Sequence, residues 1–376
     1  MRHFSWLFLV CLVPFFSARA DNTLTAPYIA ARAYYLQEVE SGQPLAALNP
    51  DQHIEPASLT KLMTAYLTFK ALREKSISPG QTVTVSQHAW KAGGSRMFIE
   101  PMKPVTVDEL IHGVIIQSGN DASIALAEAL SGSEDAFAER MNQEADRLGM
   151  HNTHFVNATG LPHPQHYSTA RDLMLLASAL IRDFPEYYPL YSIKEYRYND
   201  IAQPNRNRLL WLDASVDGLK TGHTESAGYC LISSARRGER RLLAVVLGTS
   251  SDLARTTESQ KLLNWGFQTF ESQHLFQKNA PVRSLAVFKG SAPEVKAGFP
   301  EDVWMTYPVG ESARARQVLV TWQPVVAPVN SGQKLGTLEI RYDDKPVVVH
   351  DLVALEPVPV GNAFTRGWDT IRLMLK

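Results

Sequence analysis

The chain has little cysteine, almost no net charge and no long apolar run. Only Cys11 and Cys230 occur among its 376 residues, so no disulfide framework can define the fold. The 37 basic side chains nearly balance 38 acidic ones, which argues against bulk nucleic-acid binding. The 22 glycines and 22 prolines are ordinary numbers that exclude collagen-like and disordered classes. No stretch reaches about eighteen apolar residues, so we expect no membrane-spanning helix and predict a globular protein of two domains.

The N-terminus has the pattern of a secretory leader. Arg2 and His3 precede an apolar run over residues 6–16, and residues 18–20 read Ala-Arg-Ala, a small-x-small cleavage pattern. We predict cleavage after residue 20. The exported chain would then keep Cys230 alone, which cannot form an internal disulfide, so the fold depends on its core even in an oxidising compartment.

Residues 21–278 are predicted to form one mixed domain. Turn residues at Ser41-Gly42 indicate an early hairpin, and residues 58–73 have the spacing of an amphipathic helix. Further helices are predicted over residues 107–117, 122–130, 133–148, 170–182 and 258–270, with a strand hairpin over 229–234 and 242–247. These elements predict an α/β (α+β) domain in which helices flank an antiparallel sheet.

From about residue 279 the pattern changes to short β-rich runs separated by turn residues. The predicted strands lie at 282–288, 303–307, 318–322, 335–342 and 347–349. Several short strands without helical periodicity indicate a small all-β sandwich. We therefore predict a second domain over 279–360, followed by a C-terminal segment over 361–376.

Three short motifs carry the chemistry: Ser58-Leu59-Thr60-Lys61, Ser118-Gly119-Asn120 and Lys220-Thr221-Gly222. Each alone is a weak signal, and Ser58 by itself is equally well read as a helix N-cap. All three in this order, in an exported chain, favour one catalytic site.

The first motif suits nucleophilic catalysis. Lys61 lies three residues after Ser58, so both side chains share one face of the predicted helix. A serine hydroxyl is a poor nucleophile until a base takes its proton, and a lysine can be that base where burial and a nearby cation lower its pKa. Lys220 is the expected second cation.

The other motifs supply polar groups around that nucleophile. Ser118 and Asn120 lie at a predicted helix break, where Ser118 is suited to relay a proton and Asn120 to bond a substrate amide. Gly222 suits a strand edge that a ligand backbone approaches closely.

Together the motifs resemble those of the low-molecular-mass penicillin-binding proteins, specifically the serine D-alanyl-D-alanine carboxypeptidases. PASLTK over residues 56–61 and DGLKTGHTESAGYCL over 217–231 look especially close to that family. The resemblance implies a penicillin-binding/β-lactamase-like transpeptidase domain. It also implies attack by Ser58 on the penultimate D-alanine carbonyl of a peptidoglycan stem peptide, and covalent binding of β-lactams.

The resemblance also implies individual roles. Lys61 would be the general base, Ser118 the proton relay, and the backbone amides of Ser58 and His223 the oxyanion hole. The substrate's terminal carboxylate would be bound by Lys220 and Thr221, with Gly222 beside it. Arg206 and Arg255 match family arginines near that end of the site. No cofactor or metal is expected.

Other enzyme classes compete with this interpretation. A class A β-lactamase needs a carboxylate on the loop between the second and third motifs, but residues 155–171 contain neither Glu nor Asp. A D,D-endopeptidase that cuts peptidoglycan cross-links shares the motifs and is the nearer alternative. A catalytically inactive binding protein is disfavoured because no motif residue is substituted.

Two features have simpler readings than catalysis. Four histidines lie at positions 151, 154, 163 and 166 without a supporting carboxylate pattern, so we do not expect a zinc site there. Cys230 lies inside a predicted strand, which favours a buried, inert thiol.

The last fourteen residues, 363–376, have amphipathic helical spacing. Phe364, Trp368, Ile371 and Leu375 fall on one face. The segment is too short to span a bilayer, so two alternatives remain: packing on the protein itself, or lying in a membrane interface. We favour the second and expect a periplasmic enzyme peripherally attached to the outer face of the inner membrane.

Overall fold

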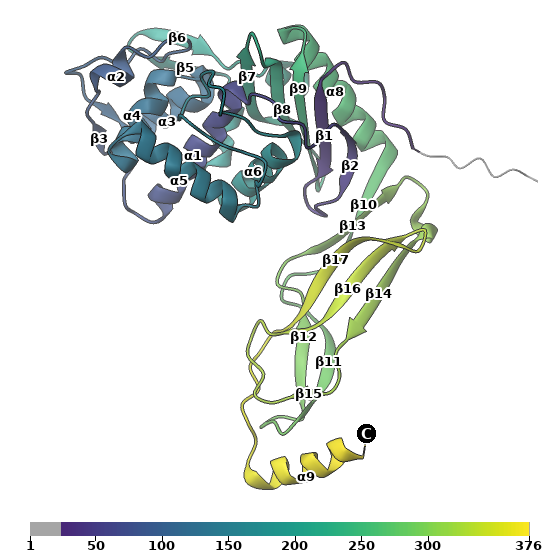
Figure 1. Cartoon of the computed structure of the whole chain (residues 1–376). Coiled ribbons are helices and arrows are strands. Elements are labelled where there is room, and N and C mark those ends of the chain that lie inside the picture. Colours follow the sequence, from purple (N-terminus) through teal and green to yellow (C-terminus); the bar gives the residue numbers. More distant parts are fainter. Residues whose placement is uncertain (1–23, 376) are drawn as a thin grey trace, which may run out of the picture.

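The computed structural model describes residues 24–375 as a helical region with a central sheet, a β-rich region and a terminal helix (Figure 1). The predicted leader, residues 1–20, lies outside the described residues. The helical region occupies one end of an elongated molecule, and the β-rich region separates it from the terminal helix.

The central sheet has five strands in the order β2-β1-β9-β8-β7, and all its pairs are antiparallel. Its strands are β1 Ala33–Glu38, β2 Pro44–Leu48, β7 Val216–Thr224, β8 Gly228–Arg237 and β9 Arg240–Thr249. The predicted hairpins β1–β2 and β8–β9 are both present. Gly42 has φ 67° and Gly238 has φ 63° in their turns, a left-handed conformation that glycine adopts without a steric cost. β7 is an edge strand, and it carries the third motif.

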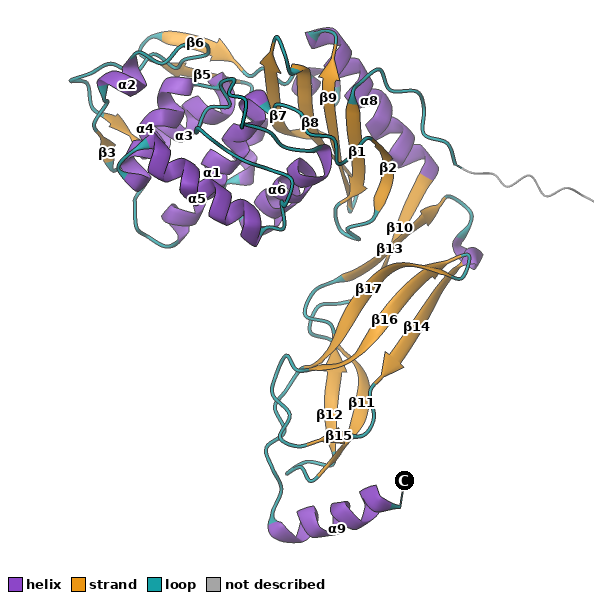
Figure 2. Ribbon diagram, viewed as in Figure 1, coloured by secondary structure: helices purple, strands orange, loops and turns teal. Residues whose placement is uncertain are grey.

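Helix α8 (Asp252–Thr269) covers one face of this sheet, and α6 (Ala170–Asp183) packs on the other (Figure 2). The other helices of this region are α1 Lys61–Arg73, α2 Gln87–Trp90, α3 Val107–His112, α4 Asn120–Ser131, α5 Glu134–Arg147 and α7 Leu209–Leu212, with short turns η1 Ala57–Thr60, η2 Gly113–Gln117 and η3 Tyr188–Ser192. Two small hairpins lie at the periphery: β3 Thr82–Val83 with β4 Val105–Thr106, and β5 Glu195–Tyr198 with β6 Ile201–Pro204.

Strand alternation in β9 explains why both faces are covered. Leu243, Val245 and Leu247 pack into the core on the side of α1 and α6. Their neighbours Leu242 and Val246, together with Ala244, pack against residues of α8 on the other side. Because successive side chains of a strand point to opposite faces, this continuous apolar run indicates burial on both sides.

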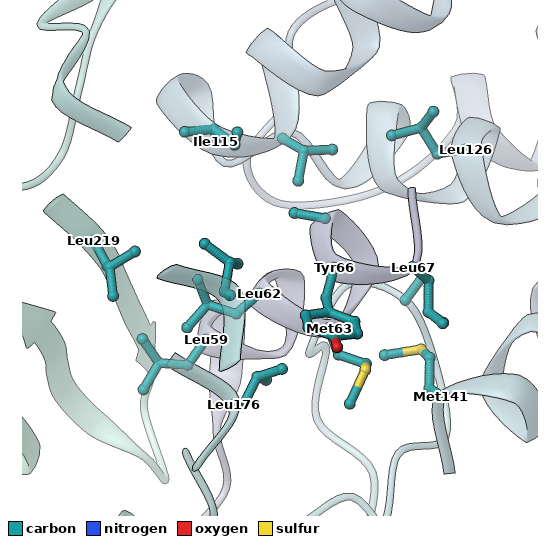
Figure 3. Close-up of a cluster of buried hydrophobic side chains, with 14 of the residues drawn as sticks. Leu59, Leu62, Met63, Tyr66, Leu67, Ile115, Leu126, Met141, Leu176 and Leu219 are labelled. Atoms are coloured by element: carbon teal, nitrogen blue, oxygen red, sulfur yellow. The ribbon is translucent and has the colours of Figure 1, made fainter. Parts of the chain in front are cut away.

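The α1 helix lies at the centre of the larger core (Figure 3). Leu62, Met63 and Tyr66 are at most 2% exposed. The sequence predicted an amphipathic helix here, but eleven of the thirteen residues of α1 are buried. Polar residues can be buried on the remaining face because their groups are satisfied; for example, Thr64 Oγ1 donates to the Ala158 carbonyl at 2.7 Å.

The β-rich region begins immediately after α8, which starts at Asp252 and ends at Thr269. The sequence instead predicted a helix over residues 258–270 and missed β10. The strands are β10 Phe270–Phe276, β11 Pro281–Phe288, β12 Glu294–Gly298, β13 Val303–Pro308, β14 Ala315–Thr321, β15 Val325–Val326, β16 Lys334–Tyr342 and β17 Lys345–Ala354, with η4 Ser312–Arg314. β10 pairs with β13, and the others form a six-stranded sheet in the order β14-β16-β17-β12-β11-β15.

The chain ends in α9, Ala363–Met374, close to the predicted limits. Asn362 caps the helix by accepting a hydrogen bond from the Thr365 amide. Among the residues described, no helix is both long and apolar enough to cross a bilayer.

Candidate active site

Ser58 lies on η1, one turn before α1. Its neighbour Ala57 has φ 48°, a left-handed conformation that is uncommon for a residue with a β-carbon. The N-cap of η1 is Pro56, and no side chain caps it, so the alternative reading of Ser58 as an N-cap is wrong. Ser58 Oγ instead lies 3.2 Å from Lys61 Nζ and faces a cleft.

Lys61 is 1% exposed, and three oxygens surround its amine. Besides Ser58, its Nζ donates to Asn120 Oδ1 at 2.7 Å and to the Thr159 carbonyl at 2.6 Å. Asn120 Nδ2 donates to the Gly93 carbonyl at 2.7 Å, which fixes the amide with its oxygen toward Lys61. The Asn120 oxygen therefore has Lys61 as its partner inside the protein, whereas the sequence argument expected Asn120 to bond a substrate amide.

Burial, and after it the Arg206 guanidinium, lower the pKa of Lys61 to about 7 against the opposing effect of the Asp121 and Glu134 carboxylates. The sequence predicted that Lys220 would supply the cationic effect. Burial pushes the pKa of Lys220 well below its ordinary value too, with Lys61 adding to the shift. Arg206 is a further cation that lowers the pKa of Lys61, and the sequence did not reveal it. A large share of Lys61 is an uncharged amine at neutral pH.

Ser118 follows the π-helical turn η2 and breaks the helix before α4, as predicted. Its φ of 59° places it in the left-handed region. Lys220 Nζ donates to Ser118 Oγ at 2.9 Å and to the Thr221 carbonyl at 3.0 Å. The second and third motifs therefore meet through Ser118 and Lys220.

Gly222 brings β7 against η1. A β-carbon at this position would lie 2.9 Å from the Pro56 carbonyl oxygen and 3.3 Å from the Ala57 β-carbon. The crowding comes from η1, whereas the sequence argument expected it from a ligand. The next residue, His223, is exposed, and its ring lies 3.9 Å from the Tyr229 ring.

The cleft has a volume of about 500 Å³. Its lining includes Ser58, Gly94, Ser95, Ser118, Arg206, Thr221, Gly222, His223, Tyr229, Asp252 and Arg255. Arg255 donates to the Gly222 carbonyl at 3.1 Å and pairs with Asp252, which also pairs with Arg208. Within residues 24–375 the Arg206 guanidinium makes no ion pair, so it remains available for an incoming carboxylate.

Sequence reasoning missed three groups at this site. Asp121 accepts hydrogen bonds from the amides of Met97, Phe98 and Ile99 and fixes the loop beside the cleft. Its position directly after Ser118-Gly119-Asn120 was an available signal. Glu134 reaches the segment 155–171 from the first turn of α5, although that segment has no acid of its own. The Thr159 carbonyl is a backbone atom, which no motif reveals.

The four histidines at 151, 154, 163 and 166 and the thiol of Cys230, which the sequence did not assign to catalysis, lie outside the cleft lining. His166 is 2% exposed and its Nε2 lies 2.8 Å from Thr60 Oγ1. No group of three metal-ligating side chains suited to a metal ion occurs in the described part of the chain. Cys230 is buried as predicted, and burial raises its pKa to about 11, which leaves an unreactive thiol.

A cleft serine beside a buried, partly uncharged lysine defines a serine acyl-transfer enzyme. The second lysine–serine pair and the adjacent antiparallel edge strand complete this site. The chain belongs to the D-alanyl-D-alanine carboxypeptidase family, whose model matches residues 20–251. A second model, the C-terminal domain of penicillin-binding protein 5, matches residues 270–360. The predicted family and fold are confirmed.

Named relatives cover nearly the whole chain. D-alanyl-D-alanine carboxypeptidase DacC of Escherichia coli (strain K12) is 42% identical over 362 residues, which are 94% of this chain and 90% of the relative. The crystal structures of penicillin-binding protein 5 from Haemophilus influenzae superpose with a TM-score of 0.84 at 39% identity, covering 89% of this chain and 99% of the other. Penicillin-binding protein 6B from Escherichia coli gives a TM-score of 0.73 at 37% identity, with coverages of 89% and 98%. The chain is a serine D-alanyl-D-alanine carboxypeptidase.

Proposed function

We propose that this enzyme removes the terminal D-alanine from peptidoglycan pentapeptide stems through an ester on Ser58. The observation that carries the proposal is the set of contacts around Lys61, whose amine lies within hydrogen-bond distance of Ser58 Oγ, Asn120 Oδ1 and the Thr159 carbonyl.

These contacts suit a general base. An uncharged amine has two hydrogens and one lone pair. The Asn120 oxygen and the Thr159 carbonyl can only accept, so they take the two hydrogens. The lone pair of Lys61 then faces Ser58 Oγ and can accept the hydroxyl proton.

Acylation follows from this arrangement. The proton of Ser58 moves to Lys61 Nζ as Oγ bonds to the penultimate D-alanine carbonyl carbon. The backbone amides of Ser58 and His223 donate to the oxyanion. When the carbon–nitrogen bond breaks, the proton passes from Lys61 through Ser118 to the leaving amine. Water then hydrolyses the ester.

Cations at the other end of the cleft suit the substrate's terminal carboxylate. Thr221 and Arg206 line the cleft, and Lys220 lies beneath it, bonded to Ser118. A bound carboxylate would favour the charged form of Lys220. Arg255 contributes indirectly, since it bonds the Gly222 carbonyl.

The direct test is a peptide ending in Lys-D-Ala-D-Ala. Free D-alanine should appear with the wild-type enzyme and be absent with Ser58→Ala. A cross-linked muropeptide dimer tests the endopeptidase alternative in parallel. Cleavage of the dimer without release of D-alanine from the pentapeptide would contradict the proposal.

We also infer that the enzyme is periplasmic and that α9 lies on the outer face of the inner membrane. Phe364, Trp368 and Leu375 are 86%, 59% and 83% exposed, which leaves the apolar face of α9 uncovered by the protein. Asp369 is buried and accepts the Lys289 amide at 2.6 Å, so α9 is attached to the β-rich region by its polar face. This arrangement favours interfacial insertion over self-packing.

Truncation of residues 363–376 should move the protein from the membrane fraction to the soluble periplasm, with penicillin labelling unchanged. Phe364→Ser with Leu375→Ser is the matched substitution that keeps Asp369 in place. Retention of both variants on membranes would contradict the role of α9.

A further inference from the structure

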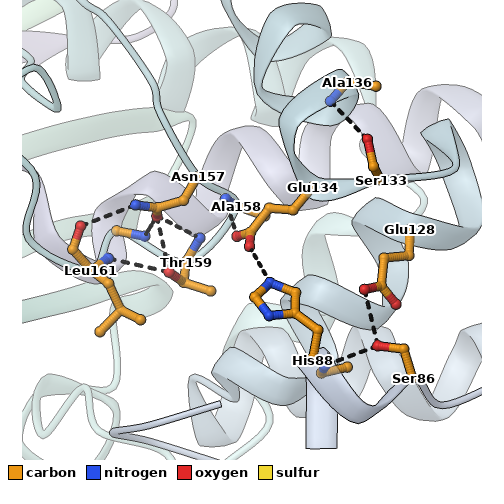
Figure 4. Close-up of polar contacts among 12 residues, drawn as sticks. Ser86, His88, Glu128, Ser133, Glu134, Ala136, Asn157, Ala158, Thr159 and Leu161 are labelled. Carbon is orange, nitrogen blue, oxygen red and sulfur yellow. Dashed lines mark hydrogen bonds and ion pairs between the residues drawn. The ribbon is translucent and has the colours of Figure 1, made fainter. Parts of the chain in front are cut away.

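The Thr159 carbonyl that bonds Lys61 belongs to a tight turn over residues 157–161, called here the Asn157 turn (Figure 4). Asn157 Oδ1 accepts three hydrogen bonds: from the Thr159 amide at 3.1 Å, from Thr159 Oγ1 at 2.9 Å and from the Gly160 amide at 2.7 Å. Asn157 Nδ2 donates to the Leu161 carbonyl at 3.1 Å. One side chain therefore fixes the backbone on both sides of the Thr159 carbonyl.

The Asn157 turn is pressed against η1. Gly160 has φ 80°, and a β-carbon there would lie 1.8 Å from the Ala57 carbonyl oxygen. The position of the Thr159 carbonyl relative to Ser58 is thus set by direct backbone packing, and small changes in the turn are transmitted to it.

A partly buried acid also anchors the turn. Glu134 is the first residue of α5, and its side chain is 14% exposed. Its Oε1 accepts the Ala158 amide at 2.9 Å, and its Oε2 pairs with His88 Nε2 at 2.9 Å. Figure 4 shows this chain of contacts from His88 through Glu134 to the turn.

We propose that Asn157 and Glu134 are positioning residues for the general base: together they place the Thr159 carbonyl so that it takes one hydrogen of the Lys61 amine and directs the lone pair at Ser58. The inference rests on the proposed role of Lys61. Neither residue touches the reacting atoms. A displaced carbonyl would let the amine rotate, and misplacement of a catalytic group by about 1 Å can cost about a hundredfold in rate.

Glu134 also affects Lys61 through its charge. The charged or titratable groups that act on Lys61 are the carboxylates of Asp121 and Glu134, the guanidinium of Arg206, the amine of Lys220 and the imidazole of His166. The Glu134 carboxylate raises the pKa of Lys61. Loss of that charge must lower the pKa and keep the amine uncharged at more acidic pH.

The experiment measures the second-order rate of penicillin acylation against pH for full-length variants. The rate should be constant at high pH, which is the plateau, and should fall at lower pH as Lys61 becomes protonated, which is the acidic limb. Glu134→Gln keeps the size of the side chain and its contact with Ala158 but removes the charge. Its acidic limb should therefore move to lower pH, with the plateau rate within about threefold of wild type. Asn157→Ala should lower the plateau about tenfold or more, because the turn loses the side chain that fixes the Thr159 carbonyl.

Asn157→Asp is the partial-rescue variant. Its carboxylate can accept the same three hydrogen bonds but cannot donate to the Leu161 carbonyl, so the plateau should recover in part relative to Asn157→Ala. Its added negative charge should move the acidic limb to higher pH, opposite to Glu134→Gln. Opposite shifts from two isosteric changes cannot arise from general destabilisation.

Matched controls come from the same elements. Glu139→Gln, on the exposed face of α5, and Asn152→Ala, in the exposed segment before the turn, should leave plateau and limb unchanged. If Glu134→Gln leaves the limb unmoved, or Asn157→Ala retains the full plateau rate, the inference is wrong. If wild type is not acylated at all, the proposed function itself has failed.

Discussion

The helical region up to Thr269 and the β-rich region after it differ in what they bury. The helical region buries Lys61, Lys220, Asp121 and other charged side chains. In the described residues after Thr269, the buried polar side chains are Thr306 and Asp369. Burying charge carries a desolvation penalty that must be offset by partners. Among these buried charges, Lys61 and Lys220 lie at the active site, whereas Asp369 attaches α9 to the β-rich region.

The two regions are connected by few polar groups. α8 runs directly into β10, and Ser41 Oγ lies 2.8 Å from Thr306 Oγ1 across the junction. The core of the β-rich region is otherwise its own apolar cluster. This region lies between the helical region and α9 (Figure 1), and the changes below should separate the effects of the two regions.

The largest effect is expected from Lys61→Ala. Removing the general base should lower the penicillin acylation rate by about 10²–10⁴-fold. Lys91→Ala, an exposed lysine after α2, is the control and should react like wild type. A decrease of less than about tenfold in Lys61→Ala would mean that another group takes the Ser58 proton.

Lys220→Ala should have the next largest effect. It removes a charge-assisted contact to the substrate carboxylate and the donor to Ser118, so kcat/KM should fall by about ten- to a hundredfold, with kcat and KM both affected. The acidic limb of the pH profile should stay in place, because burial and the Arg206 guanidinium are the causes that lower the pKa of Lys61. If Lys220→Ala displaces the acidic limb, the Lys220 amine also sets the pKa of Lys61.

The rate of penicillin acylation by the wild-type enzyme should change gradually with pH. The pKa of Lys61 is lowered to about 7, and only the uncharged amine acts as a base. Acylation should therefore reach a plateau above pH 7 and fall about tenfold per pH unit below it. Arg206→Gln removes the cation and should move this limb to higher pH. A rate that is flat between pH 5 and 8 would contradict the assignment of Lys61.

The smallest effect is expected from removal of the β-rich region. A fragment of residues 21–269 ends before β10, which pairs with β13, and it keeps all three motifs. It should react with penicillin within about twofold of the full-length rate. A soluble, monomeric fragment that is inert would show that the β-rich region supports the cleft after all.

Local patterns explain what the sequence could predict. The turn at Ser41-Gly42, the helix break at Ser118 and the three motifs depend on neighbouring residues, and each appears in the structure. The β10 strand was missed because its apolar start continues the helical pattern of α8, and its partner β13 lies far along the chain. The site was incomplete for the same reason: the effect of Arg206 on Lys61 and the position of the Thr159 carbonyl are products of tertiary packing.

Every step of the proposed reaction depends on Ser58 as the nucleophile. Intact mass spectrometry after treatment with benzylpenicillin measures this. The wild-type protein should gain the mass of one penicillin, stable for minutes or longer, and peptide mapping should place the adduct on Ser58. Ser58→Ala should gain nothing. An adduct that persists in Ser58→Ala, or no adduct on the wild-type enzyme, would contradict the central claim.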